Sequence, residues 1–162
     1  MANPQERGQW ESLLDQATTQ ALETMYFSTV VGPTETGPAP EESIAAVVSF
    51  DGDAAGAFWV TVSRDAAGEL ASNFLGEDAE AVEPERIESV IAEMTNILCG
   101  SALSGFYPEG RFVLAAPVLM GPATGLAGRS VVRRSYELDT GSLSVALALW
   151  NQPSLRPAAA AV

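Results

Sequence analysis

Residues 88–103 have the sequence ESVIAEMTNILCGSAL, in which apolar residues recur at intervals of three and four. This spacing predicts a helix with one apolar, buried side. Ser89, Glu93, Asn96 and Gly100 follow one another at i, i+4, i+7 and i+11, so they form a second stripe along the same helix. The second stripe therefore combines a hydroxyl, a carboxylate, a carboxamide and a position without a side chain.

The composition of the chain excludes several classes of function. Its 162 residues include 21 acidic and 8 basic residues and no histidine, which gives a net charge of −13. An acidic protein repels phosphates, so we expect neither nucleic acid nor an anionic membrane as a partner. Without histidine there is no Ser-His-Asp triad and no histidine-ligated zinc site. Every basic residue is arginine, and without lysine there is no Walker A loop and no Schiff-base chemistry.

The remaining composition indicates a soluble protein with a single core. The hydrophobic content of 47% is sufficient for such a core, and the length is typical of one domain. No apolar run is long enough to span a bilayer, and the N-terminus has no hydrophobic signal segment. The lone Cys99 cannot form an internal disulfide, and we interpret it as a small apolar residue of the helix. We therefore expect a cytoplasmic protein.

The order of the predicted elements indicates an α+β fold: a mostly antiparallel sheet of about six strands with long helices packed on it. Asp51-Gly52-Asp53 is typical of a hairpin turn between two strands, and the further ligands of a calcium loop are missing. Ser63 is expected to cap the helix that Gly76 ends. The predicted helices cover residues 10–27, 64–75 and 84–105, and the predicted strands cover residues 43–50, 54–63, 112–116, 118–121, 129–138 and 142–150.

Low-complexity segments mark the ends of the predicted domain. We expect a flexible leader over residues 1–9, one domain over residues 10–152 and a disordered tail over residues 153–162. The acidic residues 77–85 are expected to form a solvated loop before the central helix. The segment Pro122–Gly128 has no pattern that predicts a structure or a role.

A weak internal repeat relates the first helix to the central one. Residues 11–14 (ESLL) parallel residues 88–91 (ESVI). In that register Gln16 stands where Glu93 stands, and Thr19 stands where Asn96 stands. If the repeat is real, the first helix is a copy that has lost the acid and the amide.

The polar stripe of the central helix indicates a docking face, although an exposed Glu and Asn can also serve solvation alone. Asn is a poor residue for a helix interior, and Gly100 destabilises a helix by about 1 kcal/mol relative to Ala. A carboxamide both donates and accepts hydrogen bonds, so Asn96 can orient a water molecule. This is useful in phosphoryl transfer, in which positioning carries much of the catalysis. The pair is incomplete as an enzyme, because a partner must bring the phosphoryl group, its metal and a basic residue.

These residues resemble the signature of the CheC/CheX/FliY family of chemotaxis phosphatases. The resemblance rests on the order Ser89-x3-Glu93-x2-Asn96-Ile97-Leu98-x-Gly100, with Pro117 about twenty residues further on. The single motif, the length and the N-terminal helix are most similar to the CheX branch. The resemblance implies a pseudo-symmetric fold and the dephosphorylation of a CheY-type response regulator.

The resemblance also implies a role for each residue of the stripe. Asn96 would enter the active site of the regulator and align the water that attacks the aspartyl phosphate. Glu93 would bind the active-site lysine of the regulator, while Ser89 and Gly100 would contact the same partner. The protein would need no cofactor or metal of its own, because the magnesium would belong to the regulator. The resemblance further implies a homodimer formed through the sheet and assigns no function to Gln16 or Thr19.

Two other interpretations remain open from the sequence. The first is a non-enzymatic adaptor of the same fold, which holds a partner in a flagellar switch or a two-component system without turnover. The second is a structural domain in which Glu93 and Asn96 cap or bridge neighbouring loops of the same chain. Catalytic turnover distinguishes the adaptor from a phosphatase, and internal pairing of the two side chains would favour the structural domain.

Overall fold

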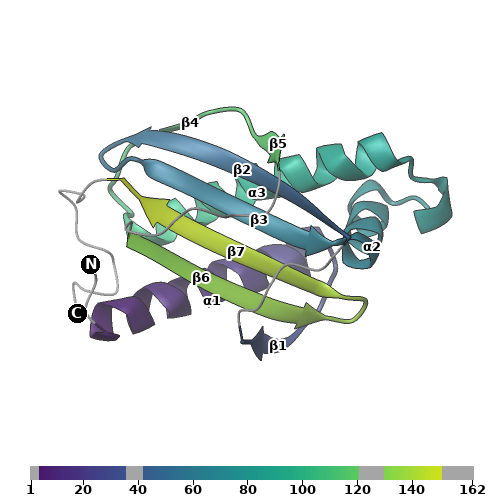
Figure 1. Ribbon diagram of the computed structural model, residues 1–162, viewed down its shortest axis with the longest axis horizontal. Helices are drawn as coiled ribbons and strands as arrows, with labels where there is room; N and C mark the ends of the chain where they lie inside the picture. Colours follow the sequence, from purple (N-terminus) through teal and green to yellow (C-terminus); the bar gives the residue numbers. More distant parts are fainter. Residues whose placement is uncertain (1–3, 36–41, 121–129, 151–162) are drawn as a thin grey trace.

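The computed structural model describes residues 4–35, 42–120 and 130–150 (Figure 1). Three α-helices, a short 3-10 helix and seven strands are present in these residues. In chain order, the elements are α1 (Pro4–Met25), β1 (Val30–Thr34), β2 (Ser43–Gly52), β3 (Gly56–Ser63), α2 (Arg64–Leu75), η1 (Ala79–Ala81), α3 (Pro84–Phe106), β4 (Phe112–Leu114), β5 (Val118–Met120), β6 (Ser130–Leu138) and β7 (Ser142–Leu149).

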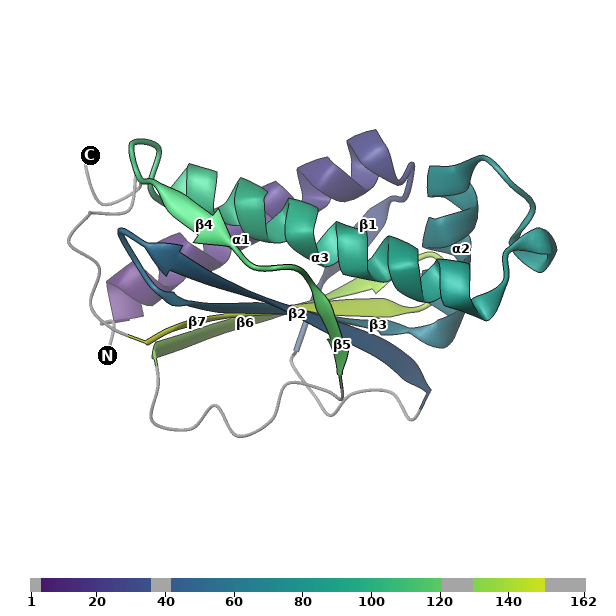
Figure 2. The ribbon, with the colours of Figure 1, turned by 90° about the horizontal axis from the view of Figure 1, so that it is seen from above.

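The strands form a single antiparallel sheet that carries the helices on one face. The strand order is β1-β6-β7-β3-β2-β4, and β5 also pairs with β2. Figure 2 shows α1, α2 and α3 on the same side of this sheet, with α1 and α3 next to each other. The predicted α+β class is therefore confirmed, with seven strands in place of about six.

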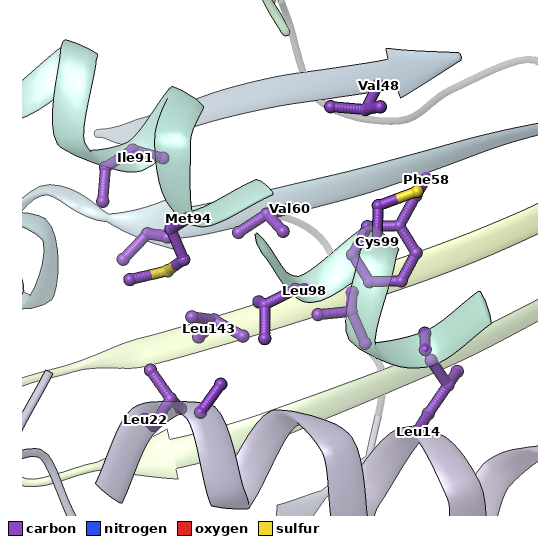
Figure 3. Packing of buried hydrophobic residues seen from close by; sticks show 14 of the residues in the cluster. Leu14, Leu22, Val48, Phe58, Val60, Ile91, Met94, Leu98, Cys99 and Leu143 are labelled. Carbon is purple, nitrogen blue, oxygen red and sulfur yellow. The ribbon is translucent and has the colours of Figure 1, made fainter. Parts of the chain in front are cut away.

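The core lies between α3, α1 and the sheet, as the apolar stripe of residues 88–103 predicts. Ile91, Met94 and Leu98 of α3 are almost completely buried. Figure 3 shows Met94 and Leu98 between Val60 of β3 and Leu22 of α1. Burying a side chain of this size stabilises the fold by about 1.5–3 kcal/mol. The helix is thus held by one face, and its other face is left to solvent.

The first helix begins earlier than the sequence pattern predicts. α1 starts at Pro4, six residues before Trp10, where the spacing of the apolar residues predicts its start. The division into a leader over residues 1–9, a domain and a tail stays a prediction. A proline fits the first turn of a helix because the backbone N–H that it lacks has no partner there. The same rule correctly places Pro84 at the start of α3. Residues 1–3, the tail and Pro122–Gly128 lie outside the described residues.

Strand β1 was not predicted, because Gly32 and Pro33 mark a loop in the sequence. In the structure this segment pairs only with β6, at the edge of the sheet. Proline is tolerated in an edge strand because the missing N–H would not have joined the sheet. Gly32-Pro33 is typical of a loop, but in this chain it belongs to an edge strand.

The limits of α2 match the prediction, but its predicted cap is wrong. Gly76 ends the helix in the left-handed conformation, with φ of 68°. Ser63 makes no capping hydrogen bond with its side chain. Its Oγ instead accepts a hydrogen bond from the backbone N–H of Ser142, 3.1 Å away. The hydroxyl therefore ties the end of β3 to the start of β7.

Candidate functional site

The four residues of the polar stripe lie on the part of α3 that faces away from the core. Ser89 and Glu93 are exposed, and Asn96 and Gly100 are partly buried. The intervening Thr95 is fully buried, and its hydroxyl donates to the carbonyl of Ile91 over 2.8 Å. The structure thus brings the four predicted site residues together on one face of one helix.

The two reactive side chains of the stripe are not used by the described fold. Neither the Glu93 carboxylate nor the Asn96 carboxamide makes an ion pair or a side-chain hydrogen bond within residues 4–35, 42–120 and 130–150. The Ser89 hydroxyl, in contrast, donates to the carbonyl of Glu85, 3.0 Å away. Among the loops that the structure describes, Glu93 and Asn96 therefore bridge none, which speaks against the interpretation as a structural domain.

Gly100 is not required by the packing of the chain. A Cβ atom placed on this residue would meet no atom within 4 Å. Gly100 also lies in the middle of α3, where glycine destabilises a helix by about 1 kcal/mol relative to alanine. Within the described residues no contact requires a glycine here, and the surface next to Asn96 is open at this position.

Tyr26, a residue that sequence reasoning missed, lies close to Glu93. Its side chain is completely buried, and its hydroxyl has no hydrogen-bond partner among the described residues. Burial raises the pKa of Tyr26, and the nearby negative charge of Glu93 raises that pKa further. The hydroxyl therefore stays protonated. Tyr26 directly follows the last residue of α1, and no spacing in the sequence links that position to α3.

The start of α3 is surrounded by acidic residues. Asp78, Glu80, Glu83 and Glu85 are exposed along the connection from α2 and the first turn of α3. The ion pair described nearby joins Arg86 to Glu77 over 2.7 Å. An excess of negative charge of this kind attracts a cationic partner. Within the described residues, no cluster of three or more Cys, Asp or Glu side chains is arranged to hold a metal ion.

The thiol next to the stripe is excluded as a nucleophile. Cys99 is completely buried in the core. Burial raises its pKa to about 12, so the thiol stays protonated at neutral pH. Because the thiolate is the reactive form, this environment favours an inert packing residue. The interpretation of Cys99 as a core residue is confirmed.

Comparison with protein families gives the relationship of the chain. The family model described as chemotaxis phosphatase CheX matches residues 44–129, which is more than half of the sequence. The chain belongs to the CheX family. The matched region includes all of α3 with its polar stripe. It also includes Pro117, which is partly buried and directly precedes β5.

Solved structures share this CheX-family fold at low sequence identity. A chemotaxis protein CheX from Desulfovibrio desulfuricans is 20% identical, with a TM-score of 0.69 over 87% of this chain and 99% of that one. A chemotaxis protein CheX from Vibrio vulnificus is also 20% identical, with a TM-score of 0.68 over 91% and 99% of the two chains. The structure of a CheX-CheY-BeF3-Mg²⁺ complex from Borrelia burgdorferi is 17% identical, with a TM-score of 0.69 over 88% and 98%. These likenesses establish the fold.

Two further findings concern this CheX-family chain. No protein with a curated description matches its sequence. Among the described residues, no helix combines the length and the apolar content that a membrane crossing requires.

Proposed function

We propose that this protein is a phosphatase that hydrolyses the aspartyl phosphate of a CheY-type response regulator. The observation that carries the proposal is the state of Glu93 and Asn96 on α3. Both side chains are presented together on a helix anchored in the core, and neither has a partner in the described fold. Membership of the CheX family supports the reaction class.

In the proposed reaction, Asn96 enters the active site of the regulator and positions a water molecule. The carboxamide accepts a hydrogen bond from this water or donates one to it, and so aims a lone pair of the water at phosphorus. A bond forms between the water oxygen and phosphorus, and the bond from phosphorus to the aspartyl oxygen breaks. The regulator recovers its aspartate, and inorganic phosphate leaves. A neutral amide suits this task, because a carboxylate would be repelled by the phosphoryl oxygens.

Glu93 is proposed to anchor the complex through a cation of the regulator. One turn of helix separates Glu93 from Asn96, so the negative charge is held away from the phosphoryl group. The described chain offers Glu93 no cation, which leaves the carboxylate available to the active-site lysine of the partner. The magnesium stays with the regulator, and no metal or cofactor is assigned to this chain.

Ser89 and Gly100 are proposed to border the contact at its two ends. The hydroxyl oxygen of Ser89 can still accept a hydrogen bond after donating to Glu85. The open surface above Gly100 leaves room for the backbone of the partner to approach the helix. Both roles follow from exposure on the same face as Asn96.

We also propose that the protein is a cytoplasmic homodimer that pairs through its sheet. The face of the sheet away from the helices carries a second apolar cluster, which includes Trp59 of β3 and Ala146 of β7. Trp150 packs edge-on against Trp59 and remains partly exposed. Trp59 and Ala146 are themselves buried within the single chain, so the exposed ring of Trp150 is the apolar part of this face that is proposed to meet a second subunit.

An adaptor without turnover is the second candidate. The fold is shared with a chain in the structure of a FliM-SpeE complex from H. pylori, with a TM-score of 0.58 and 7% identity. The same architecture therefore occurs in a protein solved as part of a complex. The adaptor and the phosphatase make the same contact and differ in whether one molecule processes many regulators.

The test is the decay of phosphate on a panel of CheY-type receiver domains from the same organism. A small molar fraction of this protein, mixed with an excess of phosphorylated receiver, should accelerate the decay through multiple turnovers. Glu93→Ala should raise KM about tenfold or more with a smaller change in kcat, since it removes a docking charge. Glu88→Ala, also on α3 but off the stripe, is the control and should leave KM unchanged. Binding without turnover for every receiver would favour the adaptor.

A further inference from the structure

Three exposed apolar side chains, Met25, Phe27 and Phe74, adjoin the site at Tyr26. Met25 and Phe27 flank Tyr26 in the chain, and the ring of Phe74 stacks on the Tyr26 ring with 5.1 Å between centroids. Tyr26 is also close enough to Glu93 for the two groups to interact electrostatically. We call Met25, Phe27 and Phe74 the apolar patch. It joins the ends of α1 and α2, which lie together beside α3 in Figure 2.

Phe27 combines two features that are unusual for a phenylalanine. Its φ is 49°, the left-handed conformation that bulky residues rarely adopt, and 73% of its side chain is exposed. The left-handed turn ends α1 and allows the N–H of Ser28 to reach the carbonyl of Leu22 over 3.0 Å. Glycine would make the same turn without strain. Strain at a residue that also exposes an aromatic ring points to a binding role.

The charges around the apolar patch define what covers it. Glu23 is exposed in the last turn of α1, which contains no basic residue. A negative charge is unfavourable at that end of a helix, because the helix dipole favours a cation there. Glu23 and Glu93 beside the apolar patch favour a partner whose surface is apolar and positively charged. At this patch a second copy would bring the same two acids against Glu23 and Glu93, so a second copy and an anionic membrane are both disfavoured here.

We infer that the apolar patch is a second docking contact for the receiver domain that Glu93 and Asn96 engage. This inference rests on the proposed function. The receiver places apolar side chains on Phe27 and Phe74 and a basic residue against Glu23. The contact fixes the rotation of the receiver about α3, so that Asn96 enters its active site at one angle. The patch sets specificity, because only receivers with an apolar and basic surface beside the active site fit.

Steady-state dephosphorylation of a purified, phosphorylated CheY-type receiver by Phe27→Gly and Phe74→Ser tests this inference. Each variant should raise KM roughly tenfold, as expected from the loss of one buried aromatic contact, with kcat within about twofold. Val113→Ser is the matched control. Val113 is 74% exposed on β4, at the end of the molecule far from α2 in both ribbon views. This control should leave KM unchanged. Thermal unfolding of Phe27→Gly should occur at the wild-type temperature or above it, since glycine relieves the left-handed strain.

Each other result has a defined meaning. Wild-type KM for both variants would overturn the inference while leaving the proposed function in place. Light scattering that shows a dimer lost in Phe27→Gly, with KM unchanged, would assign the patch to a second copy and also overturn it. A wild-type protein that accelerates decay on no receiver would remove the proposed function itself, and the inference with it.

Discussion

Helices α1 and α3 occupy similar places on the sheet but use their polar residues in opposite ways. The two helices lie next to each other. Ser12, Gln16 and Thr19 of α1 are exposed, exposed and partly buried, and the matching residues of α3 have the same order of burial. Thr18 and Thr95, which are 77 positions apart, are both buried. The positions compared, each 77 residues apart, are Ser12 with Ser89, Gln16 with Glu93, and Thr19 with Asn96. The weak sequence repeat therefore has a counterpart in the structure.

The difference between the helices lies in where their carboxylates are used. On α1, Asp15 and Glu11 both bind Arg134 of β6, with three contacts of 2.8 Å. Asp15 also accepts a hydrogen bond from Tyr136 over 2.7 Å. On α3, Ala92 takes the position of Asp15, and Glu93 is left without a cation in the described chain. The first helix uses its charge to hold the fold, whereas the charge of Glu93 is not used within the described residues and is the one that we propose for the partner.

The largest expected effect on stability comes from cutting the anchor of α1. Arg134→Met leaves Asp15 and Glu11 without their shared cation, and we expect a loss of about 2–3 kcal/mol in the free energy of unfolding. Arg86→Met breaks the exposed pair with Glu77 and should lower it by less than about 1 kcal/mol. Urea unfolding of both variants measures the difference. Equal losses would show that Arg134 does not anchor α1 as the geometry indicates.

A smaller effect separates the two buried tyrosines. Tyr136→Phe removes the hydroxyl that donates to Asp15, and we expect a loss of about 1.5 kcal/mol in the free energy of unfolding. Tyr26→Phe removes a buried hydroxyl with no partner in the described residues, so stability should stay unchanged or rise by up to about 1 kcal/mol. Urea unfolding at pH 7, where both hydroxyls are protonated, compares the two variants. A larger loss for Tyr26→Phe than for Tyr136→Phe would contradict this assignment.

The sequence predicts an element well where a periodic pattern of apolar residues extends over many positions. The prediction is poorer where one residue type fits two different local structures. The stripe of α3 and its buried side follow from spacing alone, because a helix converts spacing into faces. Pro33 breaks a helix but is tolerated in an edge strand, so β1 was missed. Ser63 has the chemistry of a cap, yet its hydroxyl binds Ser142, which lies far away in the chain. Such a choice depends on tertiary contacts that spacing does not contain.

The candidate site also has a part that could be predicted from the sequence and a part that could not. Glu93 and Asn96 could be identified from one stretch, because both belong to a single helix. Tyr26, Phe27 and Phe74 come from two other parts of the chain, and only the packing of α1 and α2 against α3 brings them to this site. The order of strands in the sheet, which sets that packing, is not encoded in any local pattern. The amide and acid were therefore predictable, and the apolar surroundings were not.

We propose that α3 carries the catalytic side chain and that α1 only stabilises the fold. One pair of substitutions at matched positions of the two helices tests this difference. Asn96→Ala and Thr19→Ala each remove a side chain 77 residues apart on the two helices, and kcat is measured on a phosphorylated CheY-type receiver. We predict that Asn96→Ala lowers kcat by about 10²–10³, with unchanged urea unfolding, while Thr19→Ala leaves kcat at the wild-type value. Wild-type kcat in Asn96→Ala, or an equal loss in Thr19→Ala, would contradict it.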